Sequence, residues 1–319
     1  MNVQILIQNG DKVYQPIVQE GITWQTERKG SPGKLTFTVV KDQTINFTEG
    51  NLVRLVVDGV KLFYGFIFSK KRDKQQNITV TAYDQLRYLK NKDTIDYKNK
   101  TASDFIRMVA NDYKLNIGSI ENTSYVIPVR TETNTTLIDM ILNALDLEVT
   151  NKKTLYVFYD DFGKLTLKSL ERMKVGAVID EETGENFDYT SSIDSQTYNQ
   201  IKLQYENEKT GKRETYVAKD SSNINNWGLL QYYDTLQEGE NGQAKVDALL
   251  SLYNAKTRNL KITNAFGNLK VRAGSMVVVN LNLGDVAVQN FMLVENCKHT
   301  FNESEHRMDL TLRGGEFVG

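Results

Sequence analysis

The sequence predicts an α+β fold dominated by β-strands, and three observations support this prediction. Short runs that alternate apolar with polar residues, or that consist of β-branched and aromatic residues, recur along the 319 residues. Only 3 prolines occur against 21 glycines, and Gly and Asn stand between the runs, which is typical of a chain with many turns. Helical spacing of apolar residues is confined to a few segments. The length predicts two or three domains of about 100 to 200 residues each.

The composition indicates a folded protein without a charge bias. Hydrophobic residues make up 40% and charged residues 25% of the chain, the values of an ordinary globular protein. The 39 Lys and Arg residues almost cancel the 40 Asp and Glu residues, leaving a net charge of -1. We therefore expect no specific nucleic-acid binding, because a chain with almost no net charge does not attract the negatively charged phosphate backbone. No segment approaches the roughly 20 apolar residues of a spanning helix, so we also expect no membrane insertion.

The amino terminus and the cysteine content predict where the chain folds. The first residues, MNVQILIQNGDK, lack a basic region, a long apolar stretch and a small-residue cleavage site, so they do not resemble a secretion signal. The single cysteine, Cys297, has no partner for an internal disulfide. Both observations predict folding in a reducing cytoplasm.

The first domain is expected at residues 1–84 and is typical of an antiparallel meander. Turn residues at Gly30–Gly33 and Asp58–Gly59, and a later charged stretch, divide its apolar runs. Phe63 and Phe66 stand at odd spacing in one run, so they are predicted to face opposite sides of the sheet. The runs are ITWQTE, KLTFTVV, NLVRLVV, KLFYGFIF and NITVTAY.

A small α/β domain is expected at residues 85–188. Thr101 followed by Asp104 predicts a capping box at the start of a helix. A second helix is predicted after Asn134, because five apolar residues there form a stripe at helical spacing. They are Leu137, Ile138, Ile141, Leu142 and Leu145.

The same domain is predicted to close with a hairpin and a connector. LYVFY and KLTLKSL flank a turn at Asp160–Gly163, which favours a hairpin. The segment 175–195, VGAVIDEETGENFDYTSSIDS, is acidic and rich in Gly, Ser and Thr, which is typical of a connector. A domain boundary is therefore expected near residue 188.

The second β-rich domain is expected at residues 189–319, with a helical insertion near residues 241–257. The runs NQIKLQYEN and RETYVAK predict a hairpin around Thr210–Lys212. The insertion is predicted as an amphipathic helix with Val246, Leu249, Leu250 and Tyr253 on one face. The closing runs NLKIT, SMVVVNL, VQNFMLVENCKH and HRMDLTL predict four strands.

Cys297, His299 and His306 are the residues that suggest a metal site. In a strand, Cys297 and His299 point to the same face, and His306 begins the next strand across a turn, so the three side chains can converge. A fourth ligand at metal spacing is missing, and one Cys-x-His pair is a weak signal. A structural role is therefore expected, with neither a metal nor a cofactor.

The sequence does not predict an enzyme. Asp160 and Asp161 form a carboxylate pair of the kind that glycoside hydrolases use, but adjacent residues at a turn tip point apart, which favours solvated turn residues. Asp161-Phe162-Gly163 spells a kinase tripeptide without the glycine-rich loop, strand lysine or HRD motif that accompanies it in kinases. The nucleophile patterns GxSxG and SxxK are missing, and a triad would have to use one of only two histidines. We expect neither a catalytic residue nor a small-molecule substrate.

A basic cluster lies between two of the predicted strands. It comprises Lys70, Lys71, Arg72 and Lys74. Its position predicts a solvated hairpin tip, and its charge discourages edge-to-edge strand pairing.

Two stretches of the chain follow the same order of patterns. Gly50 is followed by LVRLVV, LFYGFIFSKK and NITVTAYD, and Gly274 is followed by MVVVNL, NFMLVENCKH and RMDLTLRG. Each is a strand, a hairpin turn, a long aromatic-led strand, a polar turn and an alternating strand. The sequence therefore predicts that residues 50–84 and 274–314 are two copies of one β unit.

With these elements in order, the chain resembles the baseplate hub proteins of contractile phage tails, the phage late control D family, which also occurs in phage-tail-like particles. The resemblance begins with EGNLVRLVVDGVKLFYGFI and TAYDQLRYL, and continues through the helices TASDFIRMVANDY and NTTLIDMIL. It ends with the hairpin YVFYDDFGKLTL and the strands VVVNL and MDLTL. It covers most of the chain as a resemblance of layout, and it departs at residues 175–195 and 243–256.

The resemblance implies a structural protein. In such hubs, three subunits form a ring that is lined by two antiparallel β-barrel-like domains of each subunit and that joins the central spike to the tail tube. The implied partners are further copies of this chain, the central spike protein, the tail tube initiator and other baseplate proteins. The implied location is the host cytoplasm during assembly and then the baseplate of the virion tail. Two β units per chain predict approximate sixfold symmetry for the trimer, while the interface residues stay unknown.

Two other functions remain open. A tail-associated cell-wall hydrolase would depend on His299, Asp160 or Asp161. A receptor-binding tail-tip protein would display aromatic platforms on loops, whereas the aromatic residues of this chain lie within strand patterns. A hub could also serve a bacteriocin, a contractile secretion device or a non-contractile tail.

Overall fold

Most strands of the protein belong to one large sheet. The computed structural model describes residues 1–42, 44–194, 196–206, 211–236, 240–282 and 287–314. Their largest sheet has 13 strands, and three smaller sheets accompany it, so the predicted β-dominated α+β fold is confirmed. The barrel-like domains are not confirmed, because no sheet of the described residues closes into a barrel. None of the helices in these ranges is long and apolar enough to cross a membrane.

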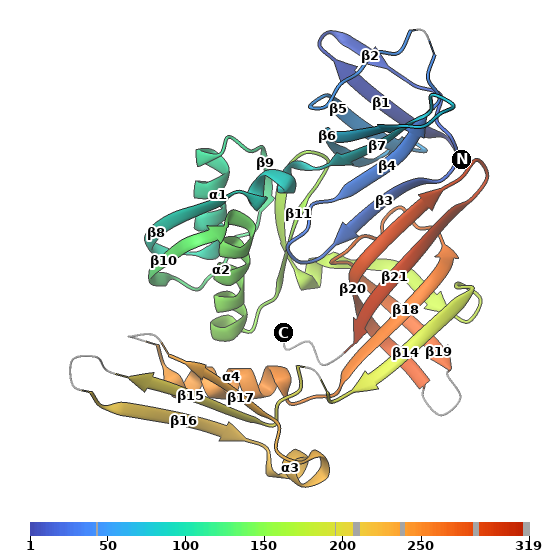
Figure 1. The fold of residues 1–319 in the computed structure, drawn as a ribbon. Coiled ribbons are helices and arrows are strands. Elements are labelled where there is room, and N and C mark those ends of the chain that lie inside the picture. Colours follow the sequence, from blue (N-terminus) through green and yellow to red (C-terminus); the bar gives the residue numbers. More distant parts are fainter. Residues whose placement is uncertain (43, 195, 207–210, 237–239, 283–286, 315–319) are drawn as a thin grey trace.

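The first β unit is an antiparallel sheet in the order β3-β4-β7-β6-β5-β1-β2 (Figure 1). Phe63 lies in its core with 2% of its surface exposed, whereas Phe66 is half-buried on the other face, with its ring 5.9 Å from that of Tyr88. The predicted opposite orientation of the two rings is therefore confirmed. The strands are β1 (Val3–Asn9), β2 (Lys12–Tyr14), β3 (Ile22–Glu27), β4 (Lys34–Val39), β5 (Leu52–Val57), β6 (Val60–Arg72) and β7 (Ile78–Tyr83).

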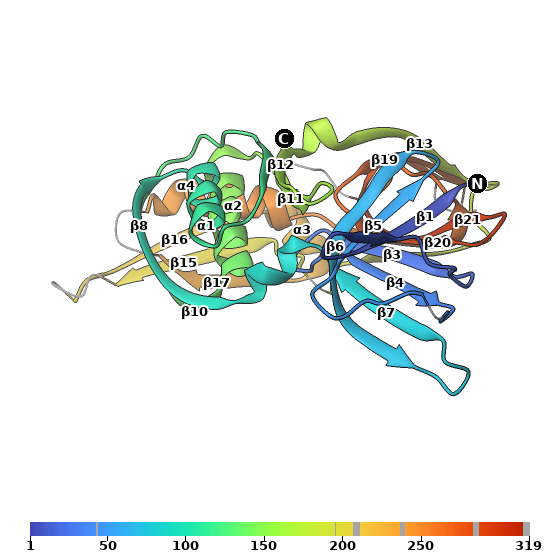
Figure 2. The same ribbon diagram turned by 90° about the horizontal axis from the view of Figure 1, so that it is seen from above.

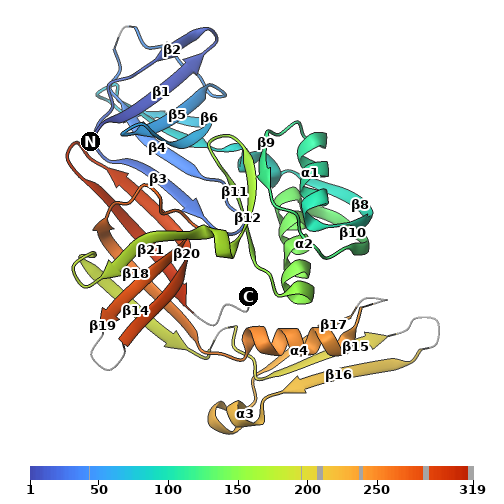
Figure 3. The same cartoon turned by 180° about the vertical axis from the view of Figure 1, so that it is seen from behind.

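An α/β unit follows and lies beside the large sheet (Figures 1 and 3). The predicted capping box is confirmed, since Asp104 N donates to Thr101 Oγ1 at 3.2 Å and Thr101 N donates to Asp104 Oδ2 at 3.1 Å. Thr136 caps the second helix by accepting from Asp139 N at 3.2 Å. The elements are η1 (Gln85–Lys90), β8 (Lys92–Lys100), α1 (Ala102–Asp112), β9 (Ile117–Ile120), β10 (Ile127–Thr136), α2 (Leu137–Lys152), β11 (Tyr156–Asp160), β12 (Leu165–Ser169) and η2 (Leu170–Met173).

The second β unit has the strand order β14-β18-β21-β20-β19-β13. Its first two strands occupy the acidic segment 175–195, so the expected connector is wrong there. The segment forms strands because β19 and β18 supply main-chain partners, and because Ala177, Ile179, Phe187 and Tyr189 pack on the core. The strands are β13 (Lys174–Asp180), β14 (Asn186–Ser192), β18 (Thr257–Phe266), β19 (Met276–Asn282), β20 (Ala287–Phe301) and β21 (His306–Gly314).

A separate layer is inserted between β14 and β18 (Figure 1). Three strands in the order β16-β15-β17 form its sheet, and the predicted helix packs on that sheet through Val246 and Leu249. The turn predicted at Thr210–Lys212 begins outside the described residues. The elements are β15 (Gln200–Glu206), β16 (Arg213–Lys219), α3 (Ser221–Trp227), β17 (Gln231–Thr235) and α4 (Gly242–Tyr253).

The two β units share one arrangement of six strands. Both follow a single chain order, and β3-β4-β7-β6-β5-β1 in the first unit corresponds to β14-β18-β21-β20-β19-β13 in the second. The outermost pair differs, since β1 runs antiparallel to β5 whereas β13 runs parallel to β19. The units are joined edge to edge, because residues 296–301 of β20 pair with β3. The large sheet therefore consists of two repeats of one unit.

Candidate functional site

Cys297, His299 and His306 converge in the second β unit, near its joint with the first. His299 Nε2 lies 3.2 Å from Cys297 Sγ, and His299 Nδ1 lies 2.8 Å from His306 Nε2. His299 Nε2 also lies 2.8 Å from the Val271 carbonyl oxygen, which can only accept. We therefore assign the proton of His299 to Nε2, so that Nδ1 accepts a hydrogen bond from His306. Trp24 stacks on His299 at 4.9 Å between ring centroids.

Burial keeps this cluster neutral. It lowers the pKa of His299 to about 3, with His306 as a second cause, and lowers the pKa of His306 to about 4. It also raises the pKa of the Cys297 thiol, so the thiolate that binds metals is suppressed. Within the residues that the structure describes, no group of His, Cys, Asp or Glu is arranged to hold a metal ion. The three side chains therefore have a structural role: they form hydrogen bonds with one another and stack in the core of the fold.

Asp160 is buried, so its expected role as a solvated turn residue is wrong. Only 5% of its surface is exposed. Asp160 Oδ1 accepts from Gly163 N at 2.7 Å, and Oδ2 accepts from Gln85 Nε2 at 2.9 Å. Burial raises its pKa, but both oxygens already have donors from the protein. Asp161 is exposed, so the two carboxylates do not face a common site.

Asp160 and Asp84 belong to a junction between the three units. Asp84 accepts from Gly33 N at 2.8 Å and from Leu86 N at 3.0 Å. Burial raises its pKa, and the nearby Asp160 raises it further. Arg272, which precedes β19, donates from Nη1 to the Asp160 carbonyl oxygen at 3.0 Å. This junction fixes the position of the β11–β12 hairpin between the large sheet and the helices (Figure 3).

The basic cluster, predicted as a solvated tip between two strands, lies at the end of β6: Lys70, Lys71 and Arg72 belong to the strand, and Lys74 follows it. Lys70 Nζ donates to the Phe47 carbonyl oxygen at 2.8 Å and lies 3.5 Å from Glu49 Oε2. Lys71, Arg72 and Lys74 are exposed, which fits a solvated hairpin tip. The edge of β6 beside this cluster carries no strand from the described part of the chain.

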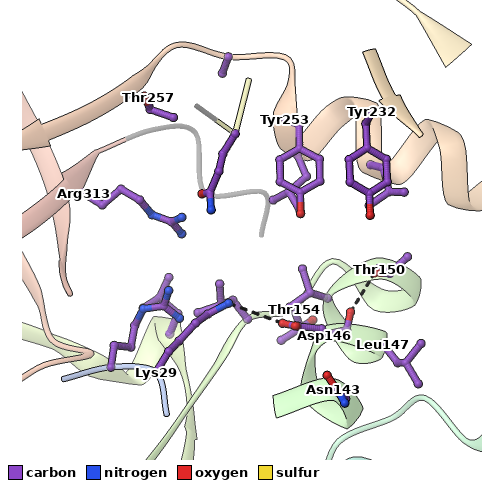
Figure 4. A pocket seen from close by; sticks show the side chains of 18 of the residues that line it. Lys29, Asn143, Asp146, Leu147, Thr150, Thr154, Tyr232, Tyr253, Thr257 and Arg313 are labelled. Atoms are coloured by element: carbon purple, nitrogen blue, oxygen red, sulfur yellow. Dashed lines mark hydrogen bonds and ion pairs between the residues drawn. The ribbon is translucent and has the colours of Figure 1, made fainter. Parts of the chain in front are cut away.

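A cleft of about 590 Å³ lies between α2 and α4. Figure 4 shows Asn143, Asp146 and Thr150 on one wall, and Tyr232 and Tyr253 on the other. Most of its cations pair with carboxylates, as Lys29 does with Asp146 at 3.8 Å. The sequence did not predict this cleft, because its walls come from segments that lie far apart in the chain. Its charged lining is Arg28, Lys29, Arg130, Lys245, Lys256, Arg313, Asp146 and Glu171.

Comparison with known proteins places this fold. The phage-like element PBSX protein XkdQ of Bacillus subtilis is 29% identical over 312 residues, with 94% of each chain covered. The prophage MuSo2 43 kDa tail protein of Shewanella oneidensis has a TM-score of 0.73 at 10% identity, over 99% of this chain and all of that one. A further match is the Escherichia coli c3393 protein, described as a type VI secretion component similar to the phage T4 tail proteins gp27 and gp5. Its TM-score is 0.57 at 10% identity, over all of this chain and 78% of that one.

These structural matches show the fold alone, whereas a family model matches the sequence itself. The model of the YQBQ-like family covers residues 22–313, which is most of the chain. This protein therefore belongs to the YQBQ-like family.

Proposed function

We propose that this protein is a structural subunit of a phage or phage-like tail, and that it forms the hub of the baseplate. Three copies form a ring that joins the central spike to the tail tube. The relative in the phage-like element PBSX supports a tail role, and so does the shared fold with a prophage tail protein. The Escherichia coli match, described as similar to the phage T4 tail proteins gp27 and gp5, supports the same tail role.

The repeat of the β unit is the observation that carries this proposal. Each chain holds two units with one strand order, and they are joined edge to edge through β3 and β20. Three such chains display six similar units, so one face of the ring suits a sixfold tube and the other a threefold spike. In this ring the two units of each chain line the channel as barrel-like domains. The protein assembles in the host cytoplasm and then resides in the baseplate.

The stoichiometry of a complex with the spike tests this proposal. The chain is co-expressed with the spike protein of its own tail gene cluster, and light scattering measures the total mass of the complex. Subtracting the mass of the spike trimer gives the number of hub chains. We expect three hub chains of 36.4 kDa each for every spike trimer. Electron micrographs of the complex should show a ring with a sixfold outline. One hub chain for every three spike chains would refute the ring.

The alternative functions have less support. A cell-wall hydrolase needs an acid and a base that reach substrate, whereas Asp160 and His299 are buried and hydrogen-bonded within the fold. Peptidoglycan cleavage by the purified chain, lost in Asp160→Asn, would favour the hydrolase. If the chain were instead a receptor-binding protein, the purified chain would bind a cell-surface polysaccharide in the absence of the spike protein.

A further inference from the structure

We propose that the end of β6, residues 68–72, pairs antiparallel with β14 of a second copy of this chain. This inference deepens the proposed ring, on which it rests, by naming the strand edges and the residues that close it. The joint between β20 and β3 within the chain is its template, because the hydrogen bonds around the long strands β6 and β20 repeat in the two β units.

Four hydrogen bonds fix the place where β6 leaves β5, and the second unit repeats all four. In the first unit they are Gly50 N to Ile67 O at 2.8 Å, Ile67 N to Asn51 O at 2.9 Å, Asn51 N to Thr48 O at 3.2 Å and Thr48 N to Asn51 Oδ1 at 2.9 Å. In the second they are Gly274 N to Val294 O at 2.8 Å, Val294 N to Ser275 O at 2.9 Å, Ser275 N to Arg272 O at 3.0 Å and Arg272 N to Ser275 Oγ at 3.1 Å. Ile67 therefore corresponds to Val294.

A bulge follows at the same place in both long strands. The pairing of β6 with β7 skips Phe68, and the pairing of β20 with β21 skips Glu295. Beyond the bulge, each long strand extends past its hairpin partner, β5 or β19, and exposes one edge. In the second unit β3 occupies that edge. In the first unit, no strand from the described ranges pairs there, and Figure 2 shows the β6–β7 hairpin projecting from the sheet.

β14 is the counterpart of β3. The β3–β4 pairing sets Trp24 opposite Leu35, and the β14–β18 pairing sets Tyr189 opposite Leu260. The other edge of β3 pairs with β20, whereas the other edge of β14 has no partner among the strands of the described chain. Within the described ranges, each copy therefore leaves one edge of each kind unpaired, at the end of β6 and along β14.

The template joint sets the register of the proposed one. In the template, Asn296 lies opposite Glu27 and His299 lies opposite Trp24. Transferred to the first unit, this register places Ser69 opposite Ser192 of the second copy. It also places Lys71 opposite Thr190, and Arg72 opposite Tyr189, of that copy. The template bond from Arg28 N to Glu295 O at 2.9 Å becomes a bond from Ile193 N of the second copy to Phe68 O.

The two joints differ in the side chains that meet there: charged residues of opposite sign meet in the template, and apolar residues meet in the proposed joint. Glu295 in the template contacts Arg28 at 2.7 Å and Arg313 at 3.1 Å. The corresponding residues of the proposed joint are Phe68, Ile193 of the second copy and Tyr83. Phe68 and Tyr83 already contact one another, with ring centroids 5.5 Å apart. An ion cluster within the chain is thus replaced by an apolar cluster between chains.

The charges near the two edges are also complementary. The antiparallel register brings the basic end of β6, with Lys71, Arg72 and Lys74, to the start of β14 in the second copy. Acidic residues surround that start, and all of them are exposed: Glu181, Glu182, Glu185 and Asp188. The basic edge therefore repels a second β6 edge and attracts β14. Each contact is head-to-tail, so a closed ring pairs both of these edges in every copy.

Disulfide trapping tests the register. Ser69→Cys and Ser192→Cys are combined in Cys297→Ser, and the chain is co-expressed with its spike and oxidised. We expect covalently closed trimers on a non-reducing gel, and cross-linked dimers when the two single variants are mixed. The matched control is Ser69→Cys with Ser191→Cys, which shifts the register by one residue and should cross-link at least tenfold less. A ring of three by mass without the cross-link would overturn this inference and leave the proposed function standing.

An exchange of joint chemistry provides a second test. Phe68→Glu places a carboxylate against Ile193 of the second copy and should reduce ring assembly at least tenfold. Adding Ile193→Arg rebuilds the ion pair of the template and should restore assembly. Both positions are half-buried, and circular dichroism of each variant monitors its fold. Full assembly of Phe68→Glu, or no recovery in the folded double variant, would overturn the inference, whereas loss of the ring in the unaltered chain would overturn the proposed function as well.

Discussion

Arg28 and Glu295 are 267 positions apart in the chain, yet they form a bidentate ion pair with distances of 2.7 and 3.0 Å. Only 5% of the Arg28 side chain is exposed. The pair closes the joint between the two β units, beside the first main-chain bond from Arg28 N to Glu295 O. Specific side-chain and main-chain contacts therefore hold the two β units together at this joint.

Arg28→Ala should lower the free energy of unfolding by about 3 kcal/mol, because it leaves Glu295 in a partly buried site with one cation fewer. Urea denaturation measures this change. Arg213→Ala removes an exposed ion pair with Glu206 and serves as the control; its cost should be at most about 0.5 kcal/mol. Equal losses in the two variants would show that the Arg28 pair contributes little to the joint.

Phe63→Ala should cost about 3 to 5 kcal/mol, since the ring is 2% exposed in the core of the first β unit. Phe66→Ala should cost less, about 1 to 2 kcal/mol, because that ring is half-buried on the opposite face. Chemical denaturation of the two variants compares them. The reverse order of losses would mean that the sheet packs its core on the other face.

The free energy of unfolding should decrease as the pH falls below about 6.5. The pKa of His299 is about 3 and that of His306 about 4 in the fold, against 6.5 for a free histidine. The unfolded chain thus binds protons that the folded chain excludes, so stability is complete above pH 6.5 and is lost toward pH 4. For the buried His299 the slope approaches about 1.4 kcal/mol per pH unit.

The histidines are isolated by comparing the native chain with His299→Phe/His306→Phe. Asp84 and Asp160 act in the opposite direction, because their raised pKa values remove stability as the pH rises. Both proteins keep these carboxyls, so the difference between their stability profiles reports the histidines. A native profile as shallow as that of the double variant would contradict the lowered pKa values.

Cys297 should react slowly with thiol reagents in the folded protein and fast after denaturation, because the thiol is buried and its pKa is raised. Absorbance after addition of a disulfide reagent measures both rates.

The purified protein should carry no stoichiometric zinc, since the Cys297–His299–His306 cluster is satisfied by its own hydrogen bonds. Elemental analysis tests this. About one zinc per chain, lost in Cys297→Ser, would prove the prediction wrong.

The local elements were predictable because their signals are local. The Thr101–Asp104 capping box begins α1 as expected, and the alternation in β5 and β7 marks the buried face of each strand. The echo after Gly50 and Gly274 was also visible, because it repeats residue patterns within single strands. These features depend on a few neighbouring residues, so the sequence shows them directly.

Features that depend on distant partners were not predictable. The turn sequence around Asp160 predicts a solvated carboxylate, because the groups that bury it, Gln85 and Arg272 among them, are distant in the chain. The composition of the acidic segment 175–195 predicts a connector, because its pairing strands, β18 and β19, lie about 70 to 100 residues further along the chain. The composition of a segment does not show which distant strand it pairs with.

The β-rich class, the helix starts and the repeated order of patterns follow from the amino-acid order alone, since propensity, capping and side-chain alternation act between neighbours. That the two β units share one sheet, through β3 and β20, follows only from the folded arrangement of the chain. The same arrangement leaves the edge at residues 68–72 and the outer edge of β14 without a partner among the strands that the structure describes. Strand edges pair through main-chain groups that every residue carries, so the partner of an edge is fixed by its place in space.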